Sequence, residues 1–188
     1  MNLTRSCNFS SAKAKVLLNL NSNHRGTYYA CVDGGADTGL FNPDHIHVES
    51  VTQRTADLHM VGTEGARTGV KIGTVLAAVS IPGEATPVLL VFHEQMIGLN
   101  SDVDIISCNQ VREFGHRVFD TARKYGGNQS IELQTSGSRI PLQYRRALMC
   151  LPFRQPTTYE LQTAERIVMT SDAPWDPECL HDPEDLSP

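Results

Sequence analysis

The chain has 188 residues, of which 40% are hydrophobic and 20% are charged, and its formal net charge is -5. This length and composition are typical of one globular domain with a hydrophobic core. The acidic balance and the scattered basic residues argue against a nucleic-acid partner. No apolar run reaches the roughly 20 residues of a membrane helix, so no membrane partner is expected either.

Residues 1–24 are rich in Asn and Ser, and we expect a leader or linker there. From Thr27 onward, short β-branched apolar runs alternate with Gly, Pro, Asn and Asp, which predicts a mostly β domain over residues 25–155. Pro82-Gly83 predicts a hairpin turn, and His93-Glu94 is expected to begin a loop. The predicted strands cover residues 28–32, 45–48, 70–75, 88–92 and 140–144.

Two helices are predicted. Residues 109–115 form a short one that ends at a glycine. A second runs from Thr157 to about residue 167, with Thr157 as N-cap and Glu160 three residues later. After Ser171 the chain is acidic and rich in proline, which is typical of disorder. Residues 156–188 are therefore expected to form a helix and a tail.

Five cysteines lie far apart, and no Cys-x-x-Cys pair occurs. A disulfide framework or a zinc site is therefore not expected, and a reducing, cytoplasmic setting fits best. His45 and His47 alternate along one predicted strand and could bind a metal, but no third ligand is evident. We expect no metal and no other cofactor. The cysteines are Cys7, Cys31, Cys108, Cys150 and Cys179.

The predicted strand at 28–32 runs into Asp33, Gly34, Gly35, Ala36 and Asp37. This pattern can present one carboxylate at the tip of a loop. Asp-Gly is also an ordinary hairpin turn, because glycine tolerates positive φ. Sugar-kinase and actin-like folds and thiamine pyrophosphokinases use similar turns, but the helices or the second acidic cluster that they need are missing here.

Two later segments add to this turn. Residues 58–72 predict a strand, a glycine-studded turn and a strand, which a plain surface hairpin would also satisfy. Ile105, Ile106, Ser107 and Asn109 lead into the predicted helix, as an ordinary core strand and helix also would. The tip of the hairpin holds Met60, Val61, Gly62, Thr63, Glu64 and Gly65.

The three segments, in this order, resemble the retropepsin-like aspartic proteases, and Ile-Ile-Ser followed by Gln-Val is closer to the form in Copia-type LTR retrotransposon polyproteins. The resemblance implies an all-β fold: a closed β-barrel with a flap hairpin, one short helix and a helical or disordered C-terminal tail. It makes Asp33 catalytic, residues 34–37 the substrate-binding turn and residues 60–65 the flap. Ile105, Ile106, Ser107 and Asn109 support the turn.

Two positions depart from the family. Gly34 stands where retropepsins carry a Ser or Thr hydroxyl, and Cys108 stands where they carry a basic residue that pairs with the second acid, here Asp37. The resemblance implies an aspartic endopeptidase that hydrolyses a polyprotein. Because the reaction needs two carboxylates, a chain with one such turn must act as a homodimer. The alternatives are an inactive dimerisation or peptide-binding module and, more distantly, a small phosphate-binding enzyme.

Overall fold

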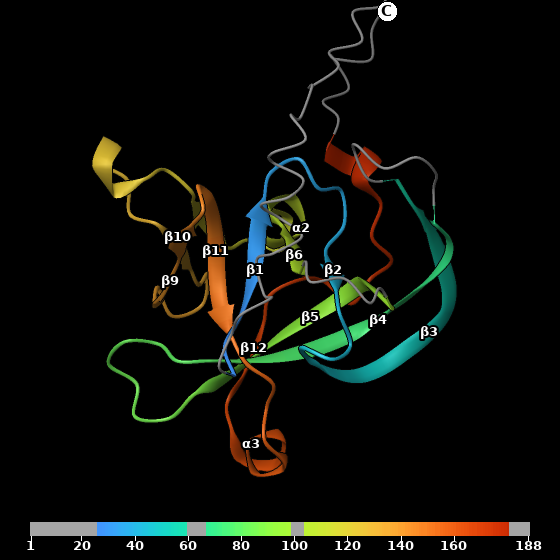
Figure 1. Cartoon of the computed structure of the whole chain (residues 1–188), viewed down its shortest axis with the longest axis horizontal. Coiled ribbons are helices and arrows are strands. Elements are labelled where there is room, and N and C mark those ends of the chain that lie inside the picture. The colour runs from blue at the N-terminus through green and yellow to red at the C-terminus, as the bar shows by residue number, and fades with distance from the viewer. Residues whose placement is uncertain (1–25, 60–66, 99–103, 181–188) are drawn as a thin grey trace, which may run out of the picture.

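The computed structural model describes residues 26–59, 67–98 and 104–180, and these form a mostly β structure (Figure 1). The predicted β class is confirmed. The strands are β1 (Tyr28–Asp33), β2 (Leu40–Phe41), β3 (His47–Leu58), β4 (Arg67–Val79), β5 (Val88–Ile97), β6 (Asp104–Ser107), β7 (Arg117–Phe119), β8 (Ser130–Glu132), β9 (Arg139–Pro141), β10 (Gln143–Arg145), β11 (Leu148–Phe153) and β12 (Arg166–Val168). The helices are α2 (Cys108–Glu113), α3 (Thr158–Thr163) and the 3-10 turns η1 (Arg123–Tyr125) and η2 (Pro177–Leu180).

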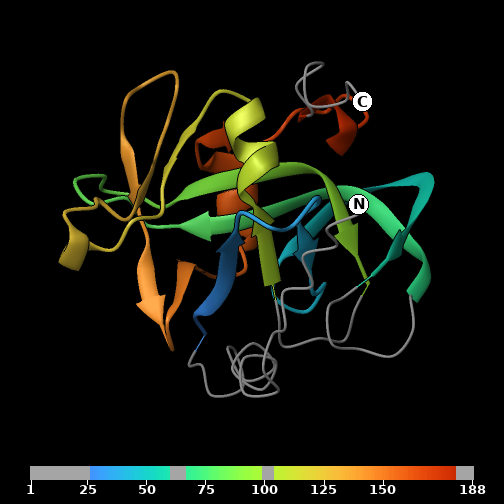
Figure 2. The ribbon, with the colours of Figure 1, turned by 90° about the horizontal axis from the view of Figure 1, so that it is seen from above.

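The main sheet is mixed and has nine strands, in the order β10-β11-β1-β6-β2-β5-β4-β3, with β12 also paired to β5. β1 lies between β11, which is antiparallel to it, and β6, which is parallel. α2 continues directly from β6 and lies beside the loop that follows β1 (Figure 2). The order of the strands therefore brings the aspartate turn next to the Ile-Ile-Ser segment.

The expected closed barrel is not present among the described residues, where β10 and β3 each pair with a single strand. One isolated bridge joins Ala78 of β4 to Arg154, the residue after β11. Its two N···O distances are 2.9 Å and 3.1 Å. β4 and β11 are each the second strand from an edge of the sheet, and the bridge between them does not extend into a ladder of paired residues.

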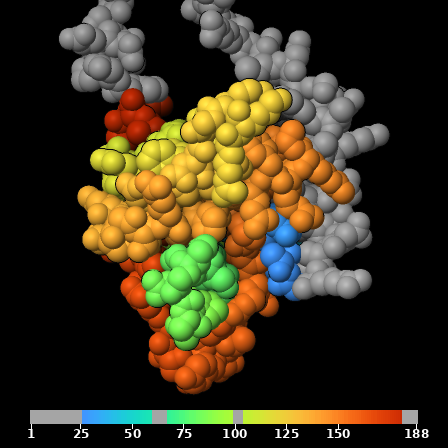
Figure 3. Space-filling view, turned by 90° about the vertical axis from the view of Figure 1, so that its left-hand side faces the viewer, coloured from blue at the N-terminus to red at the C-terminus, as the bar shows by residue number. Residues whose placement is uncertain are grey.

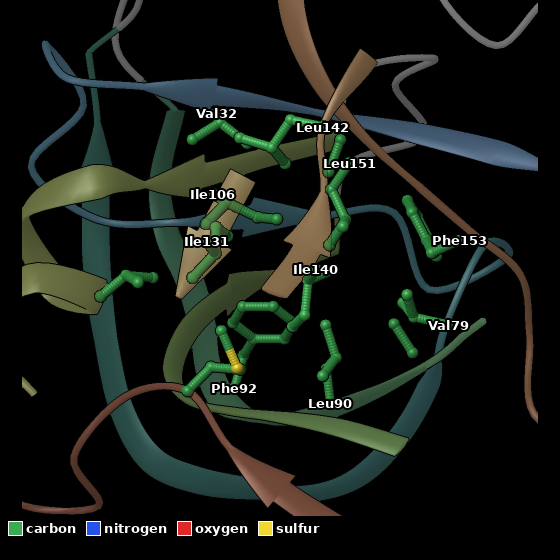
Figure 4. Packing of buried hydrophobic residues seen from close by; sticks show 14 of the residues in the cluster. Val32, Val79, Leu90, Phe92, Ile106, Ile131, Ile140, Leu142, Leu151 and Phe153 are labelled. Atoms are coloured by element: carbon green, nitrogen blue, oxygen red, sulfur yellow. The ribbon is translucent and has the colours of Figure 1, made fainter. Parts of the chain in front are cut away.

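The core lies between the main sheet and the three-stranded sheet β7-β8-β9. Residues 88–92 of β5 form a continuous apolar run because both faces of the strand are buried there. Leu90 and Phe92 face Ile131 and Ile140 of the smaller sheet (Figure 4). Leu89 and Val91 belong to a second cluster on which α3 packs. Figure 3 shows the connection between β4 and β5 in green. On this face it lies between the chain around the smaller sheet, in yellow and light orange, and the chain around α3, in deep orange.

The predicted loop at His93-Glu94 is wrong, because both residues lie inside β5. Gly73 pairs with Gln95 and Val75 with Phe92, so His93 and Glu94 together face Thr74 in a β-bulge. Glu94 has a φ of 58°, in the left-handed region. Hairpin pairing around Pro82-Gly83 is confirmed by Val79 opposite Val88.

The second predicted helix is shorter than expected. α3 begins after Thr157 and ends at Thr163, and β12 then pairs in parallel with residues 89–91 of β5. This edge of β5 is free because β2 pairs only with Met96 and Ile97. Met169 is buried just beyond β12, so the chain past residue 155 contributes to the core. No helix in the described ranges has the length and apolar character to cross a bilayer.

The predicted capping box is confirmed. The Thr157 hydroxyl accepts from Glu160 N, and the Glu160 carboxylate accepts from Thr157 N. Arg154 Nη1 also donates to Glu160 Oε2 at 2.7 Å. The hydrogen bonds from Arg154, aided by those from Thr157, lower the pKa of Glu160 to about 2.

A lowered carboxyl pKa stabilises the fold above the usual value near 4.5, and this stabilisation is lost as pH falls toward 2. We therefore expect Glu160→Gln to lower the unfolding free energy by about 1 kcal/mol at neutral pH, because the charged hydrogen bonds are lost. The difference from the parent should vanish between pH 4.5 and pH 2, measured by urea unfolding. Glu165→Gln, a change at an exposed position, is the matched control. An equal loss in both variants would contradict the assignment.

Candidate active site

The aspartate turn lies at the end of β1. Asp33 is its last residue and pairs in register with Ser107 of β6. Gly35 N donates to Asp33 Oδ1 at 2.8 Å, so the turn orients its own carboxylate. The Asp33 side chain is half-buried, whereas Gly34 and Gly35 are exposed. The site thus presents a fixed carboxylate at the surface of the sheet.

The Ile-Ile-Ser segment and the start of α2 form hydrogen bonds to the backbone of this turn. Ser107 Oγ lies 2.7 Å from Ala36 O, to which it donates, and Ser107 also caps α2 by accepting from Gln110 N. Asn109 Nδ2 donates to Gly34 O at 3.4 Å. Ser107 and Ala36 are 71 residues apart in sequence, so the fold brings the two expected segments together.

The aliphatic pair lies behind the turn, with its two side chains on opposite faces of β6. Ile106 pairs with Val32 and is 1% exposed in the main core. Ile105 is half-buried and packs against the cluster that contains Leu40 and Met96. The backbone of β6 is therefore fixed on both faces, which anchors Ser107 beneath the aspartate turn.

Gln110 is a further supporting residue, and its contacts with the turn were not predicted from the sequence. Its side chain is buried, and its Oε1 accepts from Gly39 N at 3.0 Å and from Gln95 Nε2 at 3.1 Å. Its Nε2 lies 3.3 Å from Glu94 O, to which it donates. A Cβ on Gly39 would meet Gln95 Oε1 at 1.9 Å and the backbone oxygen of Ile105 at 3.0 Å, so a side chain here would displace Gln95 from its bond to Gln110. Gln110 lies in the helix predicted at residues 109–115, and its signal in the sequence was the Gln-Val pair that follows Ile-Ile-Ser.

The C-terminal segment also reaches the turn. Trp175 Nε1 donates to Asp37 O at 2.8 Å, and Trp175 N donates to Glu94 Oε2 at 3.2 Å. Trp175 lies in the segment after Ser171, whose composition predicts disorder. The sole tryptophan of an acidic, proline-rich segment was the available signal for a packed position.

Cys108 stands where retropepsins carry a basic residue, and Asp37 is the acid with which that residue would pair. Asp37 is exposed, and it takes part in none of the ion pairs among the described residues. Cys108 is fully buried, and burial raises the pKa of its thiol to about 11. The thiol is therefore neutral at physiological pH and supplies no positive charge for Asp37. Burial likewise raises the pKa of Cys31, two residues before Asp33, to about 12.

The two strands of the expected flap are β3 and β4, which pair antiparallel as far as Leu58 opposite Arg67. The tip itself, Met60, Val61, Gly62, Thr63, Glu64 and Gly65, lies outside the described residues. Both strands are long, with 12 and 13 residues. The pairing is that of a hairpin.

The two histidines considered as metal ligands have other environments. His45 is buried, its Nδ1 lies 2.7 Å from Asp104 Oδ2, and its ring stacks on Tyr28. Asn42 N donates to the other oxygen of Asp104. His47 begins β3. Within the described ranges, no three His, Cys, Asp or Glu side chains gather as a metal would require.

The arrangement offers one oriented carboxylate, a neutral thiol near it and a hydrogen-bonded frame. Comparison of the chain with protein-family models, curated proteins and solved structures finds no match in any of the three. A functional assignment therefore depends on the residues and geometry of the turn.

The Gln110 contacts give a direct test of how the turn is held. Gln110→Leu leaves Gly39 N and Glu94 O buried without their partner, at a cost of roughly 1–3 kcal/mol for each group. We expect the unfolding free energy to fall by about 2–4 kcal/mol in urea titrations. Asn109→Ala is the comparison, because Asn109 is half-buried and its hydrogen bond to Gly34 O is long, at 3.4 Å. This substitution should lower the unfolding free energy by less than about 1 kcal/mol. Similar losses for the two variants would show that Gln110 has no special role.

Proposed function

We propose that the chain is a retropepsin-like aspartic endopeptidase of a Copia-type retrotransposon polyprotein. The observation that carries the proposal is the parallel pairing of β1 with β6, which sets Asp33 opposite Ser107. With it come the bond from Ser107 to Ala36 O and the bond from Asn109 to Gly34 O. These are the contacts that the resemblance calls for, between segments far apart in sequence.

The chemistry needs a second carboxylate. Two carboxyl groups about 3 Å apart share one proton, because both cannot ionise at once. The ionised group takes a proton from a water molecule between them, and this water attacks the peptide carbonyl. The protonated group donates to the developing oxyanion as a general acid. Asp33 is the group that the chain offers for either role.

The second carboxylate comes from Asp33 of a second copy, so the active species is a twofold homodimer. The β3–β4 hairpin serves as the flap, and an extended peptide binds beneath it by strand pairing. In this proposal the open sheet of the described residues is one half of the barrel-like retropepsin architecture. The free thiols of Cys31, Cys108 and Cys150 fit a reducing, cytoplasmic location.

Asp33→Asn tests the catalytic role. The substitution keeps the shape of the side chain but removes the shared proton, and we expect processing of a polyprotein that contains the native flanking sequence to fall roughly a thousandfold or more. Product bands at mildly acidic pH, with and without pepstatin, provide the measurement. Asp44→Asn, at an exposed aspartate outside the turn, is the control and should process normally. Equal processing by the parent and Asp33→Asn would refute the protease.

A specific observation favours the alternative of an inactive dimerisation or peptide-binding module. Gly34 lacks the hydroxyl that would hydrogen-bond across the dimer axis, and a neutral Cys108 replaces the basic partner of Asp37. Without these groups the dimer is weaker and its carboxylates are held less firmly. Pepstatin-sensitive cleavage by the parent chain would decide for the enzyme.

The hydroxyl that retropepsins carry at this position can be restored by substituting Gly34. No atom lies within 4 Å of a Cβ added there, and its φ is not positive, so a side chain fits the turn. We expect Gly34→Ser to tighten the dimer at least about tenfold relative to Gly34→Ala, since each copy regains a hydrogen bond worth roughly 1 kcal/mol. Sedimentation equilibrium measures the dissociation constant. The alanine variant controls for the lost freedom of glycine, and equal dimerisation of the two variants would place Gly34 away from the axis.

A further inference from the structure

The chain after β12 is fixed along β5. Met169 N donates to Val91 O at 2.8 Å. Thr170 Oγ accepts from His93 N at 2.8 Å and donates to His93 O at 2.9 Å. Met169 and Thr170 are both at least 98% buried. These bonds carry the segment to the bulge of β5, beside the loop that follows β1.

The bulge turns Glu94 toward this segment. Its side chain is 7% exposed and forms an ion pair with Arg54 of β3. The same carboxylate accepts from Trp175 N, while the backbone carbonyl of Glu94 accepts from Gln110. A left-handed residue that is not glycine costs free energy, and such strain is typical of positions with a specific role. Here it joins the C-terminal segment to the frame that holds Gly39.

Trp175 also contacts the aspartate turn. Its indole N–H donates to Asp37 O at 2.8 Å. Asp37 lies between Gly35, whose N–H bonds Asp33 Oδ1, and Gly39, whose N–H bonds Gln110. The indole therefore bonds the middle of a turn whose other contacts come from β6, α2 and its own backbone.

We propose that Trp175 is a positioning residue for the Asp33 turn, acting through the hydrogen bond from its indole N–H to Asp37 O. The C-terminal segment is thereby a part of the active site and not a linker that follows it. The catalytic consequence rests on the proposed protease function. The effect on the order of the turn does not depend on that function and can be measured in the chain by itself.

The test is hydrogen exchange of the Gly35 and Gly39 amides in Trp175→Phe, which keeps an aromatic ring and loses the N–H donor. Loss of one hydrogen bond should speed exchange of these two amides roughly three- to tenfold. Amides of β8, in the other sheet, should exchange as in the parent. Tyr159→Phe, at a residue 73% exposed on α3, is the matched control and should change neither set.

Cleavage assays of the same variants add a second readout. A turn that is less well held should lower kcat roughly tenfold with KM nearly unchanged, because substrate binding is retained while the carboxylate is misplaced. Unchanged exchange at Gly35 and Gly39 would overturn the proposal. Faster exchange in β8 as well would also overturn it, since Trp175 would then stabilise the whole fold. If the parent cleaves nothing, the protease function fails, and the exchange data alone judge the role of Trp175.

Discussion

The parallel pairing of β1 with β6 is the contact on which the rest of the site depends. It joins strands from distant parts of the sequence and sets Asp33 in register with Ser107. Register in a sheet is specified where faces are buried, because a slip of one residue would turn every side chain over. Val32 and Ile106 pair in this ladder and are both buried in the main core. Core packing thereby fixes the position of the aspartate turn relative to β6 and α2.

The backbone of the aspartate turn is hydrogen-bonded to the rest of the fold, whereas Gly34 and Gly35 are exposed to solvent. Ser107, Asn109, Gln110 and Trp175 all form hydrogen bonds to its backbone. Above Gly34 there is open space, and Asp33 remains partly accessible. A supported turn with an accessible carboxylate is what the proposed homodimer requires, because there each Asp33 would share a water molecule with its counterpart.

The sequence predicted strands and helix ends well where the signal is a run of apolar residues or a capping pair only a few residues apart. The apolar runs at 28–32, 70–75 and 88–92 lie in β1, β4 and β5, and the Thr157–Glu160 capping box is present. The loop predicted at His93-Glu94 is wrong because Glu94 bonds Arg54 and Trp175. His93 bonds Thr170, and these partners are all distant in sequence. Residues 166–168 became a strand because an edge of β5 was free. Gln110 and Trp175 form hydrogen bonds to Gly39 and Asp37, which are distant in sequence, so local patterns did not predict these contacts.

Mixed dimers test the central claim, that two copies of Asp33 form one active site. Parent and Asp33→Asn chains are mixed in varying proportion at constant total concentration, above the dissociation constant of the dimer, and the initial rate of peptide cleavage is measured. If both carboxylates are required, the rate follows the square of the parent fraction, so an equal mixture retains about a quarter of the activity. A rate that falls in direct proportion, to about a half, would mean that each chain works alone and would contradict the account.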